Sequence, residues 1–238
     1  MAIFEKLNFP PESSIGRIIS KENFYSQIKF TKAEKKLFTE NIKRIYLENT
    51  LNRDSINIDE YKDETREYAE IEVVRIVLNE KKGVQKITEI VNRAISNPVI
   101  IVFECSEEYL LALAHKRINL ADKSENTTEE ILYTDWLSED SPLWERLDIY
   151  RFSFRDFYTF YSGFADETAI FLAEKITDKK TDGETARKIL KENERYEKEI
   201  ESLRSELKKA TEFNKKMEIN LKIKRLEKEK TEVITNGT

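Results

Sequence analysis

The pattern of apolar and polar residues changes its period along the chain, and each period predicts an element. Residues 70–78, EIEVVRIVL, are rich in Val and Ile, which predicts a strand. Pro98 follows a helical segment and is expected to end it, and the apolar run at 99–105 predicts a fully buried strand. The helix between them begins after Gly83, and its apolar stripe consists of Val84, Ile87, Ile90, Val91 and Ile95.

Cap and turn signals place further elements on both sides of this centre. Thr31, with Glu34 three residues later, forms a capping box, so a helix is expected to begin there. A strand is expected from about Ile42 to Leu47. Residues 108–118 and 130–137 predict an antiparallel pair of strands joined by a polar loop.

Beyond Pro142, an aromatic stripe predicts a helix that packs on the body. Its members recur at helical intervals, and they are Phe154, Phe157, Tyr161, Phe164, Thr168, Phe171 and Leu172. Together these elements predict an α+β fold over residues 1–176, with a mixed β-sheet of about five strands and packed helices. Residues 177–185, TDKKTDGET, are expected to form a linker.

After this linker the apolar period changes to heptads, which predicts a helical coiled-coil arm over residues 186–232. One seam position holds Ile189, Tyr196, Leu203, Ala210 and Met217, and the other holds Asn193, Ile200, Leu207, Asn214 and Leu221. Two arrangements fit this pattern: one long helix that pairs with a second copy, or a hairpin that bends near Ala210–Asn214. The absence of Gly and Pro at the bend favours the long pairing helix, and with it a homo-oligomer.

Composition bears on the charge distribution of the protein and on its expected location in the cell. The formal net charge is −5, but residues 184–230 carry more basic than acidic side chains, so the body is acidic and the arm mildly basic. The single cysteine, Cys105, excludes an intrachain disulfide and is expected to be inert. The first residues lack the pattern of a signal peptide, and the longest apolar run, 98–103, is too short to cross a bilayer. We therefore expect a cytoplasmic protein without membrane contact.

The acidic residues Asp59, Glu70 and Glu72 offer one enzymatic interpretation. Glu70 and Glu72 alternate onto the same face of one strand, and Asp59 lies shortly before it. This order of elements is similar to that of restriction-type nucleases, which hold Mg²⁺ on such acids, but the lysine expected two positions after the acid is missing. The alternative is that the pair marks the solvated end of a strand. Gly-rich phosphate loops and zinc spacings are absent, so no cofactor is expected.

Four residues predict a contact surface on the body. Lys116 and Arg117 end one strand, and Thr134 and Trp136 lie on the strand expected to pair with it. Together they would form a polar, partly aromatic patch able to contact a phosphate or a partner loop. A structural role for the same residues is the alternative.

The segment EFNKKMEIN, residues 212–220, is the second expected contact element. Asn193 and Asn214 at seam positions would fix the register of a coiled coil at a cost in stability. The basic half of the arm, residues 208–230, could follow a phosphate backbone, although charges on a coiled coil usually form its solvated face. The residues expected to make the contact are Phe213, Asn214, Lys215, Lys216 and Asn220.

Sequence blocks from about Ser13 to Leu226 carry a family resemblance. Among them are EIEVVRIVL, LLALAHKR, LYTDWL and EFNKKMEINLKIKRL, with Lys116-Arg117 and Thr134-x-Trp136 as more specific marks. In this order they resemble the blocks of a bacterial family, domain-of-unknown-function family 4391. The resemblance implies no assigned activity. It implies that relatives are often encoded beside helicases and DNA methyltransferases, in restriction-like or anti-phage defence islands.

We therefore expect a non-enzymatic accessory or scaffolding subunit of a DNA-directed complex. Its protein partner would be a helicase or a methyltransferase, and its basic arm would be able to contact nucleic acid. The alternative from a different class is a divergent Mg²⁺-dependent nuclease that uses Asp59, Glu70 and Glu72.

Overall fold

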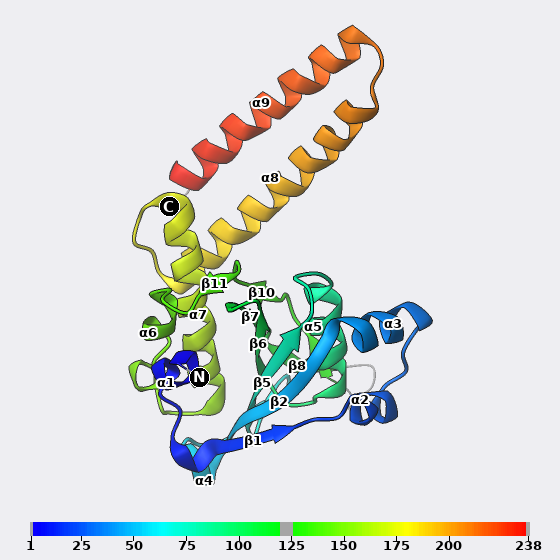
Figure 1. The fold of residues 1–238 in the computed structure, drawn as a ribbon. Helices are drawn as coiled ribbons and strands as arrows, with labels where there is room; N and C mark the ends of the chain where they lie inside the picture. The colour runs from blue at the N-terminus through cyan, green and yellow to red at the C-terminus, as the bar shows by residue number, and fades with distance from the viewer. Residues whose placement is uncertain (1, 120–125, 237–238) are drawn as a thin grey trace. The chain divides into compact units, whose positions relative to one another are not determined.

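A computed structural model describes residues 2–119 and 126–236 of the 238-residue chain (Figure 1). The chain divides into two compact units, residues 1–165 and 166–238. The division falls inside the long helix α7 (Phe157–Thr177), upstream of the linker expected at 177–185. In the part of the chain that the structure describes, no helix has the length and apolar content needed to cross a membrane.

The first unit is built on a seven-stranded mixed sheet with the order β1-β2-β5-β6-β7-β10, in which β11 also pairs with β7. Only β5 and β6 run parallel, because α5 connects them, and the remaining pairs are antiparallel. This confirms the α+β class. The strands are β1 (Ser14–Ile18), β2 (Ile42–Leu51), β5 (Ile71–Leu78), β6 (Val99–Cys105), β7 (Glu108–Leu113), β10 (Leu132–Tyr133) and β11 (Leu137–Ser138).

Two further pairs of short strands lie outside this sheet. They are β3 (Tyr61–Lys62) with β4 (Glu67–Tyr68), and β8 (Lys116–Ile118) with β9 (Asn126–Thr128). The expected strand at 108–118 is therefore divided into β7 and β8, and the expected strand at 130–137 into β10 and β11. Both of the latter pair antiparallel with β7, as expected. Part of the polar loop expected between the strands at 108–118 and 130–137 lies outside the described residues.

The remaining elements of this unit are short helices that flank the sheet. Their bounds are α1 (Ala2–Leu7), η1 (Pro11–Ser13), α2 (Lys21–Gln27), α3 (Lys32–Asn41), α4 (Arg53–Ile56), α5 (Val84–Ala94), α6 (Leu143–Arg146) and η2 (Ile149–Arg151). The capping box of α3 is confirmed. The Glu34 backbone N–H donates to the Thr31 hydroxyl, and the Thr31 N–H donates to the Glu34 carboxylate at 2.8 Å.

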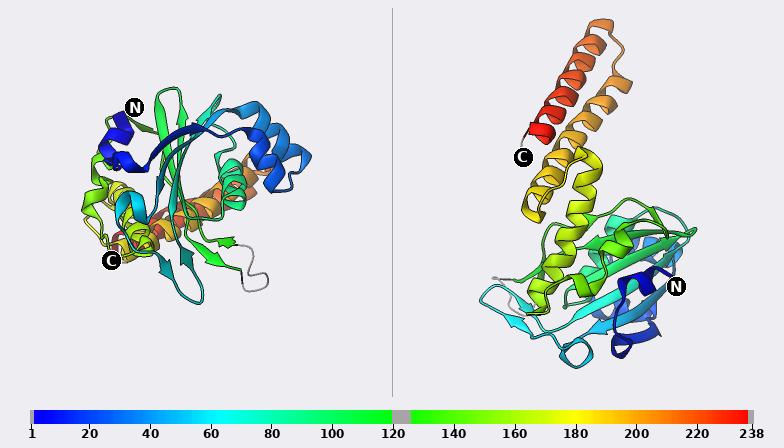
Figure 2. Two further views of the ribbon diagram at one scale, coloured as in Figure 1. Left: turned by 90° about the horizontal axis from the view of Figure 1, so that it is seen from below. Right: turned by 90° about the vertical axis from the view of Figure 1, so that its left-hand side faces the viewer.

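Helices α2, α3 and α5 cover one face of the sheet (Figures 1 and 2). Phe24 of α2 and Phe38 of α3 pack with the apolar stripe of α5 on the inward residues of β2, β5 and β6. Gly83 permits this packing at the start of α5, because its φ is +71° and a Cβ there would lie 2.7 Å from Leu37 Cδ1. This layer also contains the candidate pocket described below.

The first turns of α7 supply the core on the opposite face. The helix begins at Phe157, so Phe154 precedes it, while Phe157, Tyr161 and Phe164 are fully buried as the stripe predicts. The Tyr161 hydroxyl accepts a hydrogen bond from the Ala114 N–H at 3.0 Å and donates one to the Val99 carbonyl oxygen at 2.9 Å. One side chain thus ties α7 to the ends of β6 and β7.

The second unit contains a helical hairpin formed by α8 (Gly183–Lys209) and α9 (Phe213–Asn236). The favoured expectation of one continuous helix is therefore wrong, and the alternative, a bend near Ala210–Asn214, is confirmed. The chain leaves the helical conformation at Ala210, whose φ and ψ are −69° and 134°. Because α9 packs back along α8, the apolar face of α8 is covered within the same chain.

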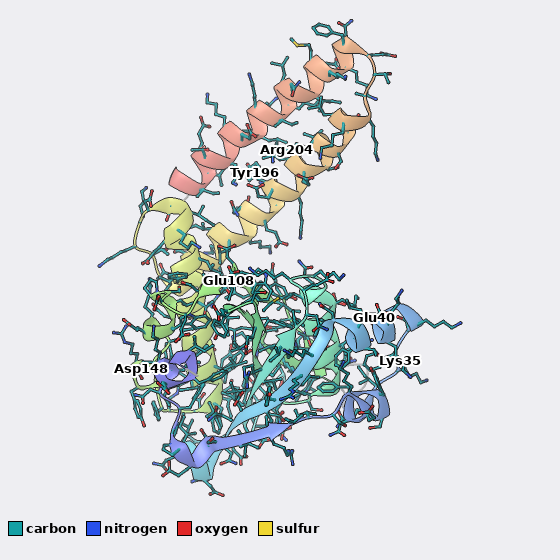
Figure 3. All side chains as sticks on the ribbon, viewed as in Figure 1. Lys35, Glu40, Glu108, Asp148, Tyr196 and Arg204 are labelled. Atoms are coloured by element: carbon teal, nitrogen blue, oxygen red, sulfur yellow. The ribbon has the colours of Figure 1, made fainter. Side chains whose placement is uncertain are left out.

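The bend also changes which residues form the seam. On α8 the expected apolar positions are correct, since Ile189, Tyr196 and Ile200 are buried. On α9 the buried positions are Ile219, Ile223 and Ile234, and Leu226 packs beside the first two. The expected seam residues Asn214, Met217 and Leu221 are exposed. Across the seam Arg204, marked in Figure 3, donates to the Glu227 carboxylate at 3.0 Å. Residues in a non-helical turn do not follow the regular rotation of a helix. A heptad count that is continued through the turn therefore assigns the wrong face of the next helix to the seam.

Candidate functional site

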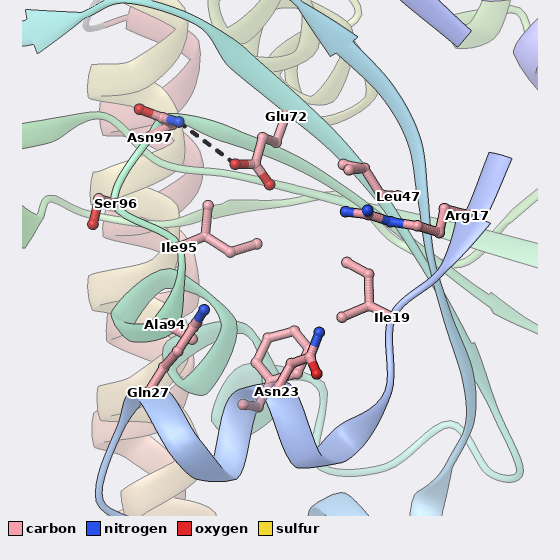
Figure 4. Close-up of a pocket in the computed structure, with 11 residues that line it drawn as sticks. Arg17, Ile19, Asn23, Gln27, Leu47, Glu72, Ala94, Ile95, Ser96 and Asn97 are labelled. Carbon is pink, nitrogen blue, oxygen red and sulfur yellow. Dashed lines mark hydrogen bonds between the residues drawn. The ribbon is translucent and has the colours of Figure 1, made fainter. Parts of the chain in front are cut away.

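A polar pocket lies where the edge of the sheet meets α2 and the end of α5 (Figure 4). Its volume is about 380 Å³. Apolar walls come from Ile19, Phe24, Leu47 and Ile95, and polar groups from Arg17, Asn23, Gln27, Glu72 and Asn97. Arg17, Asn23 and Gln27 are exposed at the rim, while Glu72 and Asn97 are half-buried. The pocket is therefore lined by both hydrogen-bond donors and acceptors around an apolar interior.

Glu72 is held in this pocket by β5 and by the loop that follows α5. Its backbone N–H donates to the Pro98 carbonyl at 3.0 Å. The amide of Asn97 donates to the Glu70 carboxylate at 2.5 Å and lies 3.5 Å from the Glu72 carboxylate. Burial raises the pKa of Glu72 above its ordinary value, and the Glu70 charge adds to this, while the Asn97 amide and the charges of Lys116 and Arg17 oppose it. The side-chain amide of Asn97 thus bridges the two carboxylates.

Lys116 lies next to this pocket and is almost fully buried, at 2% exposure. Its ammonium group donates to the backbone carbonyls of Asn92, at 3.1 Å, and Ile95, at the end of α5. Desolvation lowers its pKa to about 7, with the Glu72 charge acting in the opposite direction. Lys116 therefore caps a helix from the inside and does not contribute to an exposed patch, which corrects the expectation from the sequence.

The other residues of the expected patch are not brought together on one surface. Thr134 is buried, and its hydroxyl accepts from the Leu111 N–H at 2.9 Å. Trp136 packs against the core, and the Lys81 ammonium lies 5.2 Å from its ring centroid. Arg117 alone of the four is exposed. Cys105 is buried, which is consistent with an inert thiol.

Asp59 lies apart from Glu70 and Glu72. It forms an isolated bridge with Asp156, and its exposed carboxylate pairs with Arg53 at 3.5 Å. Among the described residues, no group of three or more His, Cys, Asp or Glu side chains could hold a metal ion. The three acids named for a nuclease therefore do not form the shared ligand set that such a reaction needs.

A second candidate surface lies at the start of α9. Phe213, Met217 and Leu221 follow each other at spacings of four and are 75%, 49% and 63% exposed. Because residues four apart share a helix face, they form one apolar stripe, which we call the tip stripe. It points away from the seam that Ile219 and Ile223 form with α8. Asn214 and Asn220 are exposed beside it and are not buried in a seam.

Basic side chains flank the tip stripe. Lys215 pairs with Glu206 of α8 at 3.4 Å, and Arg225 pairs with Glu229 at 2.7 Å. The others, Lys216, Lys222 and Lys224, are exposed and form no ion pair within the described part of the chain. Phe213, Lys215 and Lys216 therefore lie together at one exposed end of the hairpin. Their role in contacting a partner stays a prediction.

The sequence did not reveal the pocket as a site. Arg17, Asn23, Gln27 and Asn97 come from three separate segments, and none of them belongs to a spaced motif. The one visible signal was the polar Ser96-Asn97 pair before Pro98, directly ahead of a buried strand.

Comparison with known proteins yields one match. The profile of the family described as "Domain of unknown function (DUF4391)" matches residues 7–229, nearly the whole chain. No curated protein and no solved structure matches the sequence.

Proposed function

Because the chain belongs to the DUF4391 family, whose description assigns no activity, we propose its function from its surfaces. The protein is a non-enzymatic accessory subunit of a bacterial DNA-directed complex of the restriction-like or anti-phage kind. It acts in the cytoplasm and holds a protein partner through the tip stripe of its helical hairpin. A helicase or a DNA methyltransferase is the partner class that the family resemblance suggests.

The exposure of the tip stripe is the observation that supports this proposal. Phe213 is 75% exposed although it is one of the largest apolar side chains, and Met217 and Leu221 extend the same face. Apolar residues spaced by four on an exposed helix are the anchors of helix-in-groove recognition. A few well-packed side chains supply most of the binding energy of a typical interface.

The charges around the tip stripe define the partner's chemistry. Lys216, Lys222 and Lys224 are exposed beside it without an ion pair in the described part of the chain. An apolar surface bordered by acidic residues would therefore complement it, and the lysines would speed the encounter. Nucleic acid is the second partner with the required charge, but it would not use the apolar stripe.

The test is a binding measurement between the full chain and purified helicases and DNA methyltransferases of the same organism. Phe213→Ala combined with Leu221→Ala should weaken binding at least tenfold, because both anchors are removed. Val233→Ala is the matched control, since Val233 is also an exposed apolar residue of α9 but lies near its other end. If the unchanged chain, the double variant and Val233→Ala all bind the partner with equal affinity, the proposal is wrong.

Two further measurements test whether a second copy of the chain or nucleic acid binds the tip instead: light scattering and a DNA-binding assay. A dimer of the full chain that the double variant abolishes would assign the stripe to a second copy, and the partner proposal would then be wrong. DNA binding that is lost in Lys216→Ala with Lys222→Ala, but retained in the double alanine variant at Phe213 and Leu221, would assign the tip to nucleic acid.

A further inference from the structure

We propose that the pocket lined by Arg17, Asn23, Gln27, Glu72 and Asn97 binds a guanine nucleotide, with the Glu72 carboxylate hydrogen-bonded to the base. This inference is independent of the hairpin and of the partner proposed above. It concerns the first unit alone, and the pocket is lined by described residues of that unit. A bound nucleotide would make the body a ligand-binding module within the complex.

The shape of the pocket suits a flat ring. A volume of about 380 Å³ falls in the range of small-molecule sites. Ile19 and Leu47 lie on the sheet side, and Ile95 faces them from the end of α5, as Figure 4 shows. Such apolar walls can cover the two faces of a base while polar groups contact its edge.

The polar groups select the kind of base. An ionised carboxylate only accepts hydrogen bonds, and it can accept two parallel ones. Guanine presents two adjacent donors on its pairing edge, N1–H and the N2 amino group, whereas adenine places an acceptor beside its donor. The Glu72 carboxylate points into the cavity between Asn97 and Arg17, where such an edge can reach it (Figure 4).

The neighbours of Glu72 prepare it for this contact. The Asn97 amide lies 3.5 Å from one carboxylate oxygen and donates to Glu70 at 2.5 Å, so it limits the rotation of both side chains. Asn23 and Gln27 lie one turn apart on α2, and their amides can donate to guanine O6 and N7. A half-buried carboxylate that gains two donors is satisfied, whereas the same group opposite an acceptor is not.

Arg17 places the phosphate. Its guanidinium is exposed at the rim, on β1, and its charge opposes only in part the burial that raises the pKa of Glu72. A planar, permanently charged guanidinium is the side chain best suited to a phosphate group. With Glu72 on the base and Arg17 outside, the pocket fits a nucleotide better than a free base.

The experiment is calorimetric titration of the full chain with GMP, AMP and guanosine. GMP should bind about ten- to a hundredfold more tightly than AMP, the range that one bidentate base contact provides. Glu72→Gln should remove most of this preference, because an amide offers one acceptor and introduces a donor. Glu22→Gln is the matched control, since Glu22 is an exposed carboxylate on α2 that does not line the pocket.

Arg17→Ala provides the second variant, at an exposed position where folding is not at risk. It should weaken GMP binding several-fold and leave guanosine binding unchanged. Three results would each overturn the proposal: no GMP binding at millimolar concentration, equal affinity for GMP and AMP, or equal effects of Arg17→Ala on GMP and guanosine. If Glu72→Gln does not fold, the ligand series and Arg17→Ala still decide the question.

Discussion

Lys116 caps the carbonyl end of α5 from inside the protein, and burial lowers its pKa to about 7. In the unfolded chain the same amine keeps its ordinary pKa, near 10.4. Between these values the unfolded state binds more protons than the folded state, so the free energy of unfolding should rise with pH. Below pH 7 both states are charged, and this residue contributes no pH dependence.

We predict that the free energy of unfolding increases by roughly 2 kcal/mol between pH 7 and pH 9. Urea denaturation at the two pH values measures it. Tyr68 and Tyr161 have raised pKa values and act in the opposite direction, but only near and above pH 10. Lys116→Met should remove the rise, and Lys36→Met, at an exposed position of α3, should keep it. An unchanged rise in Lys116→Met would assign it to another group.

Tyr161 allows a second prediction at the same scale. Removing its hydroxyl leaves the buried Ala114 N–H without its partner at 3.0 Å. Tyr161→Phe should therefore lower the free energy of unfolding by about 1–3 kcal/mol. Denaturation of Tyr150→Phe is the comparison, because Tyr150 is exposed and its change should cost almost nothing. Equal stabilities for the two variants would contradict this role of the hydroxyl.

Residue roles were only partly predictable from the sequence. Burial of Phe157 and Tyr161 followed from a periodic stripe, because a period reports which side faces the core. The buried state of Lys116 did not, since a lysine at the start of a short strand gives no sign that a helix end lies opposite. The pocket residues were missed for the same reason: their proximity depends on packing between separate segments.

At the scale of elements, the hairpin shows where periodicity fails. Strong periods and caps predicted α3, α5 and the strands at 71–78 and 99–105. The edge strand β1 was missed because all five of its residues are exposed and no alternation marks it. The bend at residues 210–212 contains no Gly or Pro, so the sequence composition favoured one continuous helix. The structure has two helices there instead, because α9 packs back on α8.

A matched pair of substitutions tests the phase of α9. Ile219 is 3% exposed in the seam with α8, whereas Met217 is 49% exposed two residues earlier. Ile219→Ala should destabilise the hairpin by about 2–5 kcal/mol. Met217→Ala should change it by less than about 0.5 kcal/mol. Thermal unfolding followed by far-UV circular dichroism measures both, and the reverse order would restore the uninterrupted heptad pattern.

The start of α7 carries the aromatic core on the second face of the sheet. Phe157→Ala removes a fully buried ring at the first position of this helix. We expect a loss of about 3–5 kcal/mol in the free energy of unfolding. Phe154→Ala, at a half-buried position before the helix, should cost clearly less. A melting temperature unaffected by Phe157→Ala would show that this ring is not part of the core.

At the scale of the whole molecule, the two units have separate apolar clusters. Both tryptophans, Trp136 and Trp144, belong to the first unit, so their fluorescence reports that unit alone. Circular dichroism also reports α8 and α9. Ile219→Ala should therefore shift part of the dichroism transition in urea while the fluorescence transition stays in place. Coincident shifts of both signals would show that the chain unfolds as one cooperative block.

The position of α7 in the chain has a consequence for synthesis. The strands of the large sheet are complete at Ser138, but the residues of α7 that cover one face, Phe157 to Phe164, are added later. At the usual rate of about 5–20 residues per second, a nascent sheet waits a few seconds with that apolar face uncovered. This interval is when the chain is most exposed to aggregation and most in need of a chaperone. The hairpin emerges last and adds no comparable delay, because its helices are neighbours in sequence and contacts of that kind form rapidly.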